Sequence, residues 1–126
     1  MFEDEPDIVV EVEPEYLAGR SNIMKDVYAF SYHITIRNEG EEPAILRRRN
    51  WLITNAHGEV QEVSGPGVVG EEPLLLPGDE FEYTSGATVT TPWASMEGHY
   101  EFELSDGSFF RVDIPLFHLQ AEITLQ

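Results

Sequence analysis

Three glycines in the run Gly65-Pro66-Gly67-Val68-Val69-Gly70 have the G-x-G-x-x-G spacing of a dinucleotide-binding loop. That chemistry requires a strand before the loop and a helix after it, so that the N-terminus of the helix faces a pyrophosphate. Residues 71–78 contain two prolines, which deny a helix its amide donors, and two glutamates, including Glu71, which would repel a phosphate. We therefore interpret the run as a loop of an all-β domain, in which the glycines set the conformation of the backbone. Binding of a small anion, such as pyrophosphate or a nucleotide, is kept as an alternative.

Other catalytic and metal-binding patterns have little support in the sequence. There is no Gly-x-Ser-x-Gly nucleophile elbow, and the absence of cysteine excludes thiol chemistry and argues against a closed zinc site. The four histidines, His33, His57, His99 and His118, form no His-x-His or His-x-x-x-His pair. We therefore predict a protein that is not an enzyme and has no cofactor and no dedicated metal site. A divalent-cation sensor that uses surface acids is a second alternative.

The run Arg47-Arg48-Arg49 holds three of the seven basic residues of the chain. One interpretation is a site for an anion or an acidic partner, with Trp51 as a stacking platform. The other, which we favour, is that the first or third arginine neutralises neighbouring acids such as Glu62 or Glu82.

The chain of 126 residues is strongly acidic, with 24 acids and a net charge of −17. Such a charge opposes binding to nucleic acid or to an anionic membrane, and it suits a salt-rich cytoplasm in which self-repulsion is screened. The acidic start of the chain does not resemble a secretion signal, and no apolar window is long enough to span a membrane. We expect a cytoplasmic location.

Alternation of apolar and polar residues dominates the chain and predicts strands. The clearest case is residues 30–37, where one face carries Phe30, Tyr32, Ile34 and Ile36. Similar segments, separated by turns rich in glycine, proline, asparagine and aspartate, predict seven or eight short strands and no long helix. Residues 15–26 are expected to hold a single turn or a loop. This pattern favours an antiparallel β-sandwich in one domain, residues 1–126, with a core over residues 8–119 and a tail over residues 120–126 that adds an edge strand or hangs free.

The alternation breaks once, in residues 44–54. There Leu46 and Leu52 fall in one phase, whereas Trp51 and Ile53 fall in the other. Either a β-bulge near residues 47–50 re-aims the side chains, or one arginine is partly buried beside an acid or an aromatic ring. We favour the bulge.

Five blocks of the sequence resemble the ApaG family, in order and without large gaps over residues 8–119. They are Arg49-Asn50-Trp51-Leu52-Ile53-Thr54, residues 65–73, residues 77–86, Met96-Glu97-Gly98-His99-Tyr100 and Ile114-Pro115-Leu116-Phe117-His118-Leu119. The chain departs from the family pattern in having Asn50 in place of histidine, Ala87 in place of cysteine and Ala94 in place of glycine. The change at Ala87 removes any thiol role, and the change at Ala94 implies that this position does not require a positive φ.

The resemblance implies a fibronectin type III-like, immunoglobulin-like β-sandwich and a family without an established catalytic activity. The family, also named CorD, is linked to cobalt tolerance and magnesium efflux. Its domain also occurs in eukaryotic F-box proteins and in a polymerase delta-interacting protein. There it looks like a module for protein interaction.

We therefore predict a protein-binding surface formed by the loop of residues 65–73 with Arg49, Trp51 and Tyr83. The glycines would set the shape of the loop, Val68 and Val69 would offer apolar contact, and Arg49 would donate a charge-assisted hydrogen bond. The alternative for the two valines is that they plug the end of the core. The partner is expected to be a protein, and pairing of edge strands into a homodimer is compatible with this interpretation.

Overall fold

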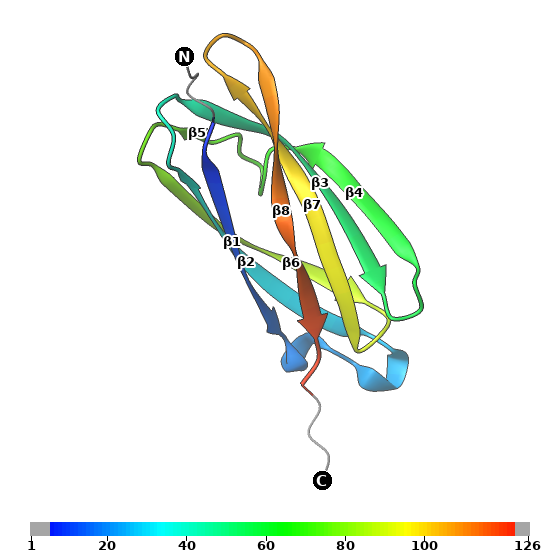
Figure 1. Ribbon diagram of the computed structural model, residues 1–126. Coiled ribbons are helices and arrows are strands. Elements are labelled where there is room, and N and C mark those ends of the chain that lie inside the picture. Colours follow the sequence, from blue (N-terminus) through cyan, green and yellow to red (C-terminus); the bar gives the residue numbers. More distant parts are fainter. Residues whose placement is uncertain (1–5, 123–126) are drawn as a thin grey trace.

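The computed structural model describes residues 6–122, which form two antiparallel β-sheets packed face to face (Figure 1). The strands are Ile8–Tyr16 (β1), Tyr28–Asn38 (β2), Ala44–Asn55 (β3), Val60–Pro66 (β4), Leu74–Leu75 (β5), Glu80–Val89 (β6), Trp93–Leu104 (β7) and Phe109–Gln120 (β8). The predicted all-β sandwich of seven to eight strands is confirmed.

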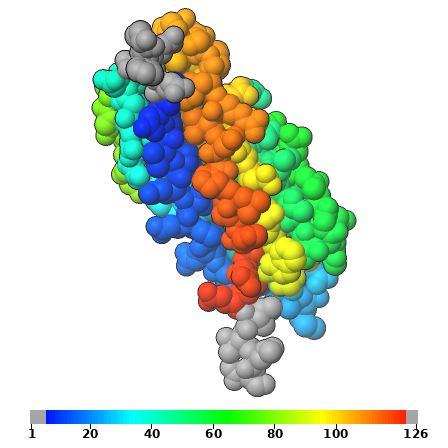
Figure 2. Space-filling model, in the orientation of Figure 1, coloured from blue at the N-terminus to red at the C-terminus, as the bar shows by residue number. Residues whose placement is uncertain are grey.

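One sheet has the strand order β1-β2-β6, and the other has the order β4-β3-β7-β8, with the short β5 paired to the start of β3. At one side of the sandwich β1 and β8 lie side by side (Figures 1 and 2). The outer strands at the opposite side are therefore β4 and β6. Within the described part of the chain, each of these two has a single strand partner, so each keeps one backbone edge unpaired.

The core lies between the sheets and is built from the apolar faces that the alternation predicts. In β2 the side chains of Phe30, Tyr32, Ile34 and Ile36 are all buried. Tyr32 lies against Trp51 of the other sheet, with ring centroids 5.3 Å apart, and both rings contact Phe117 of β8. Such edge-to-face aromatic contacts stabilise the packing of the two sheets beyond the area that they bury.

A β-bulge at Arg47 interrupts β3, as predicted. Leu46 pairs with Phe102 of β7, but Arg48 pairs with the very next β7 residue, Glu101, so Arg47 is the extra residue. The bulge changes the phase of the strand. Leu46 before it and Trp51 after it consequently both point into the core, although they are five positions apart.

The predicted turn or loop in residues 15–26 contains the end of β1 and two single turns of 3₁₀ helix, Ala18–Arg20 and Ile23–Lys25. At the other end of the chain β8 continues to Gln120, so residues 118–120 extend a strand. Of the predicted tail, residues 121 and 122 follow the strand, and residues 123–126, like residues 1–5, lie outside the described residues. The described residues contain no helix that is long and apolar enough to cross a membrane.

Candidate functional site

The glycine-rich run forms a β-hairpin with a two-residue loop, and no helix follows it within the described part of the chain. Val68 and Glu71 exchange both of their backbone hydrogen bonds, at 2.8 and 2.9 Å. Between them Val69 has φ 45° and Gly70 has φ 80°, which is the backbone geometry of a type I′ turn. The spacing of the glycines therefore reflects the shape of the backbone rather than a strand-loop-helix unit.

At two other glycines in this run a side chain would closely approach neighbouring atoms. Gly67 has φ 58°, and a Cβ atom there would collide with the carbonyl of Glu71. Gly65 lies under the guanidinium of Arg49, because a Cβ atom there would be 3.2 Å from both terminal nitrogens of that side chain. The amide of Gly67 donates to the carbonyl of Arg47 at 2.8 Å, so the base of the hairpin is fixed to the bulge of β3.

Arg49 supports this hairpin from below. Its Nη1 atom donates to the carbonyl oxygens of Pro66, at 2.9 Å, and Gly67, at 3.0 Å. These acceptors are neutral, and among the described residues no carboxylate lies within 4.0 Å of Arg49. The guanidinium therefore keeps a positive charge that no acid in residues 6–122 neutralises.

The prediction that Glu62 or Glu82 neutralises an arginine of the run is wrong. Arg47 forms ion pairs with Glu72, at 3.0 Å, and Glu103, at 2.8 Å. On β4, Glu62 instead accepts a hydrogen bond from Nδ2 of Asn50 at 2.9 Å. The other expected partner, Glu82, lies 2.8 Å from Nε2 of His33 on the outer face of the second sheet.

One valine of the hairpin plugs the end of the core, and the other offers apolar surface, so each interpretation holds for one of them. Val68 is fully buried and packs into the core, whereas Val69 at the turn is 51% exposed. The buried valine anchors the hairpin, and the exposed valine offers apolar surface beside it.

A small cavity of about 180 Å³ lies between the hairpin and the two sheets. It is lined by six of the residues predicted to form a binding surface, together with two neighbours from the β1-β2-β6 sheet. These lining residues are Arg49, Trp51, Val68, Val69, Gly70 and Tyr83, with Tyr32 and Ser85. The structure thus brings most of the predicted residues together, while Gly65, Gly67 and Glu71 shape the hairpin without lining the cavity.

The cavity is one end of a longer groove along the open side of the sandwich, between β4 and β6. A second hollow of about 280 Å³ shares Tyr32, Arg49, Trp51 and Ser85 with the first. A third, of about 240 Å³, continues it and shares Ile53, Gln61 and Thr88 with the second. Sequence reasoning missed this groove, which we call the β4–β6 groove, because it depends on which strands are outermost in the two sheets.

The middle of the β4–β6 groove has an apolar floor and low walls. Trp51, Ile53 and Met96 line its floor, and the β6 wall is formed by the small residues of the run Ser85-Gly86-Ala87. Small side chains on an outer strand leave space that larger residues would fill. A run of small residues within a predicted strand could therefore have indicated a hollow.

Three tyrosine hydroxyls lie near Arg49. The hydroxyls of Tyr83 and Tyr100 are 2.6 Å apart. Burial raises the pKa of both side chains, and it also raises the pKa of Tyr32, although a hydrogen bond to Ser85 and the charge of Arg49 act in the opposite direction on Tyr32. These groups therefore stay neutral at physiological pH and act as hydrogen-bond donors and acceptors rather than as bases.

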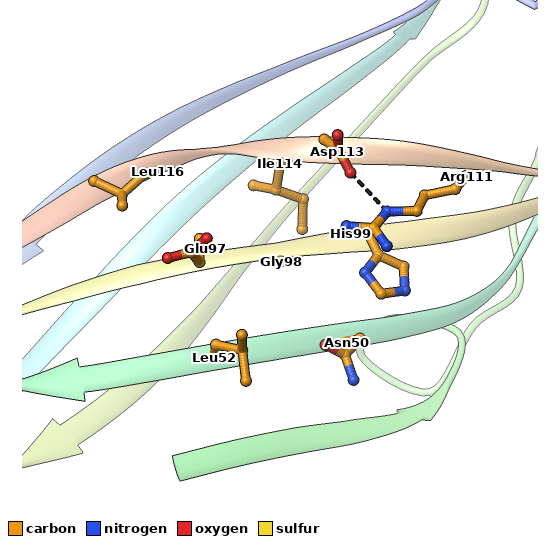
Figure 3. Close-up of a pocket in the computed structure, with 9 residues that line it drawn as sticks. All are labelled: Asn50, Leu52, Glu97, Gly98, His99, Arg111, Asp113, Ile114 and Leu116. Atoms are coloured by element: carbon orange, nitrogen blue, oxygen red, sulfur yellow. Dashed lines mark hydrogen bonds and ion pairs between the residues drawn. The ribbon is translucent and has the colours of Figure 1, made fainter. Parts of the chain in front are cut away.

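A separate hollow of about 460 Å³ lies on the outer face of the β4-β3-β7-β8 sheet (Figure 3). Figure 3 shows His99 on β7 and the ion pair of Arg111 with Asp113, whose atoms are 2.7 Å apart, along the same face. Leu52 and Leu116 lie at its other end. Of the strands beneath it, β3 and β7 are paired on both sides, whereas β8 pairs with β7 alone and its other edge lies beside β1.

The described residues contain no group of three or more histidine, aspartate or glutamate side chains that could hold a metal ion. His33 and His99 lie on the outer faces of the two sheets. Each has a glutamate nearby, Glu82 for His33 and Glu101 for His99.

The model of the ApaG domain family matches residues 18–104, and this span contains every strand that borders the β4–β6 groove. The chain belongs to the ApaG family. It is 53% identical over 110 residues to Protein ApaG of Parvibaculum lavamentivorans, covering 87% of this chain and 85% of that protein. It is 50% identical over 112 residues to Protein ApaG of Chromobacterium violaceum, covering 89% of each chain.

A crystal structure described as an ApaA protein from Bordetella pertussis has the same architecture as this ApaG chain. The TM-score is 0.91 at 41% sequence identity, and the alignment covers 96% of this chain and 98% of the other. The two chains therefore share the sandwich over nearly their whole length.

Proposed function

We propose that this ApaG-family chain is a non-enzymatic protein-interaction module that binds an extended segment of a partner protein in the β4–β6 groove. The observation that carries the proposal is that the groove runs between two strands whose outer backbone edges have no strand partner within residues 6–122. Unpaired N–H and C=O groups along a strand edge are the means by which proteins bind extended peptides as an added strand.

The side chains of the groove support the same occupant. An added strand places alternate side chains on one face, and the partly exposed Ile53 and Val63, which line the groove above the buried Trp51 and Met96, would receive them. The space above the floor is provided by the small residues of β6. At the hairpin end Val69 would add apolar contact, since about half of its surface is exposed.

The alternatives have less support from the geometry. The amides of Gly67, Val68 and Glu71 already donate to carbonyl groups of the protein, so the hairpin has few free donors with which to cradle a diphosphate. A divalent-cation sensor has no side-chain cluster to support it among the described residues. In this proposal the link of the family to cobalt tolerance and magnesium efflux is an indirect effect of the bound partner.

The test is a screen of a random library of ten-residue peptides against the folded chain, followed by NMR mapping of the bound peptides. We expect the amide shifts to concentrate on the outer edges of β4 and β6. Ala87→Phe, which fills the groove, should abolish binding, whereas Thr35→Phe on the outer face of β2 should leave it unchanged. A screen without binders, or shifts on the outer hollow of Figure 3 instead, would overturn the proposal.

A further inference from the structure

The lining of the β4–β6 groove contains two charged residues, and they lie at its two ends. Among the residues that line its three hollows, Arg49 is at the hairpin end and Glu59 is at the other end. All the lining residues between them are uncharged. The groove is therefore electrically asymmetric along its length.

Arg49 is built to receive a carboxylate. Its Nη1 atom is held by two neutral carbonyl oxygens, and within residues 6–122 no acid compensates its charge. The hydroxyl groups of Tyr32 and Ser85 line the same cavity. A carboxylate placed there would accept charge-assisted hydrogen bonds from the guanidinium and further bonds from the hydroxyls, which are stronger than bonds between neutral groups.

Glu59 is suited to a cation at the opposite end. Its Oε1 atom accepts a hydrogen bond from Nδ2 of Asn55 at 2.7 Å, which fixes the orientation of the carboxylate without neutralising it. No described arginine, lysine or histidine lies within 4.0 Å of it. A lysine or arginine side chain of a bound segment could pair with this carboxylate.

The separation of the two charges sets the length of the segment. Arg49 and Asn55, the residue that holds Glu59, are six positions apart on β3. An extended strand rises about 3.3 Å per residue, so these two backbone positions are roughly 20 Å apart, the length of about six residues of a bound strand.

We infer that the β4–β6 groove selects an extended protein segment that carries an acidic side chain at the Arg49 end and, about six residues away, a basic side chain at the Glu59 end, with apolar residues alternating between them. This inference rests on the proposed function and specifies its partner. Because the chain has a net charge of −17, a segment with several acids would be repelled, whereas a segment with a single acid and a single base has no net charge to repel.

The test varies the ligand and leaves the protein intact. The first probe is a peptide with blocked ends that has aspartate and lysine six positions apart and alternating valine and serine between them. The second replaces the aspartate by asparagine, and the third moves the lysine to two positions from the aspartate. We expect the first probe to bind to the groove amides and the other two to bind about tenfold more weakly, which is the loss of one charge-assisted hydrogen bond.

A charge exchange in the protein gives an independent readout. Arg49→Glu should weaken the first probe and should restore binding of a probe that has lysine in place of aspartate, and NMR spectra of the variant verify that it is folded. Inorganic pyrophosphate is the competitor, and displacement of the first probe at micromolar pyrophosphate would overturn the inference in favour of a free-anion site.

The failures of the two proposals are distinguishable. If all three probes bind to the groove with equal affinity, the charge selection is wrong and the peptide-binding function stands. If none of the probes shifts an amide of β4 or β6 and the random library also yields no binder, both proposals fail.

Discussion

The hydroxyl of Tyr83 lies 2.6 Å from the hydroxyl of Tyr100, and the two side chains come from opposite sheets of the sandwich. Both rings are buried, and each hydroxyl finds its partner in the other. Among the described residues no buried side-chain nitrogen or oxygen lacks a hydrogen bond. This contact fixes the relative position of β6 and β7 beside the cavity at the hairpin.

We expect a double-mutant cycle to show strong coupling between these two tyrosines. Tyr83→Phe or Tyr100→Phe alone leaves the remaining hydroxyl buried without a partner, which should lower the free energy of unfolding by about 1–3 kcal/mol. The double variant Tyr83→Phe/Tyr100→Phe removes both groups and should be less destabilised than the sum of the single variants. Urea unfolding measures all four proteins, and additive effects would contradict the prediction.

The same pair predicts a loss of stability in alkali. Burial raises the pKa of both tyrosines in the folded protein above the ordinary value of about 10. Below that value both groups are neutral in both states and stability does not change. From about pH 10 upward the unfolded chain loses these protons first, so the free energy of unfolding falls, by up to about 1.4 kcal/mol per pH unit for each tyrosine.

Unfolding by urea at a series of alkaline pH values checks this prediction. The double variant Tyr83→Phe/Tyr100→Phe should lose stability less steeply than the unchanged chain. Equal slopes for the two proteins would show that other groups govern alkaline unfolding.

Val69 occupies a turn position that does not suit its side chain. A β-branched residue with φ 45° is strained, and type I′ turns prefer Asn-Gly at their two central positions. Val69→Asn should therefore raise the free energy of unfolding by about 1 kcal/mol. Val69→Ala is the control, because it removes the same apolar surface without supplying a residue that tolerates positive φ.

The same substitution separates stability from binding. If Val69 contacts the partner segment, Val69→Asn should weaken peptide binding while it stabilises the fold, as is common for strained residues at functional sites. A variant that gains both stability and affinity would show that Val69 makes no contact with the ligand.

The two positive-φ glycines of the hairpin should respond differently to alanine. Gly70→Ala adds a methyl group in open space and should cost about 1 kcal/mol for the left-handed backbone alone. Gly67→Ala adds a methyl group that collides with the carbonyl of Glu71, so it should cost more than about 2 kcal/mol. Thermal unfolding of the two variants compares them, and similar losses would mean that the hairpin shifts to accommodate either one.

The net charge of −17 predicts that salt stabilises the protein. Added NaCl screens the repulsion among the acids, which is larger in the compact folded state than in the expanded unfolded chain. The free energy of unfolding should therefore rise with NaCl and stay unchanged with an uncharged solute of equal osmolarity that is not excluded from the surface. A stability independent of salt would remove the idea of adaptation to a salt-rich cytoplasm.

Local pattern was sufficient to predict most of the fold. The alternation from Phe30 to Ile36 predicts both the strand and its buried face, because a period of two residues is imposed by the backbone itself. The break in alternation before Trp51 similarly predicts the bulge, because no regular strand can bury both Leu46 and Trp51.

The features that the sequence did not predict depend on contacts between residues that are distant along the chain. The acid partners of Arg47 are 25 and 56 positions away along the chain, and they become neighbours only when the sheets are assembled. The groove arises in the same way from the order of the strands. The type I′ turn was not predicted, because a β-branched residue such as Val69 is rare at a turn position with positive φ.

The single extra residue at Arg47 has a consequence for how the chain tolerates insertions and deletions. Deleting Arg47 would leave Leu46 and Trp51 four positions apart, so an uninterrupted pleat would keep both in the core and in the same register with β7. What the deletion would remove is the pair of ion contacts that Arg47 makes with Glu72 and Glu103. The segment should therefore tolerate the loss of this one residue better than a substitution that places a polar side chain at Trp51.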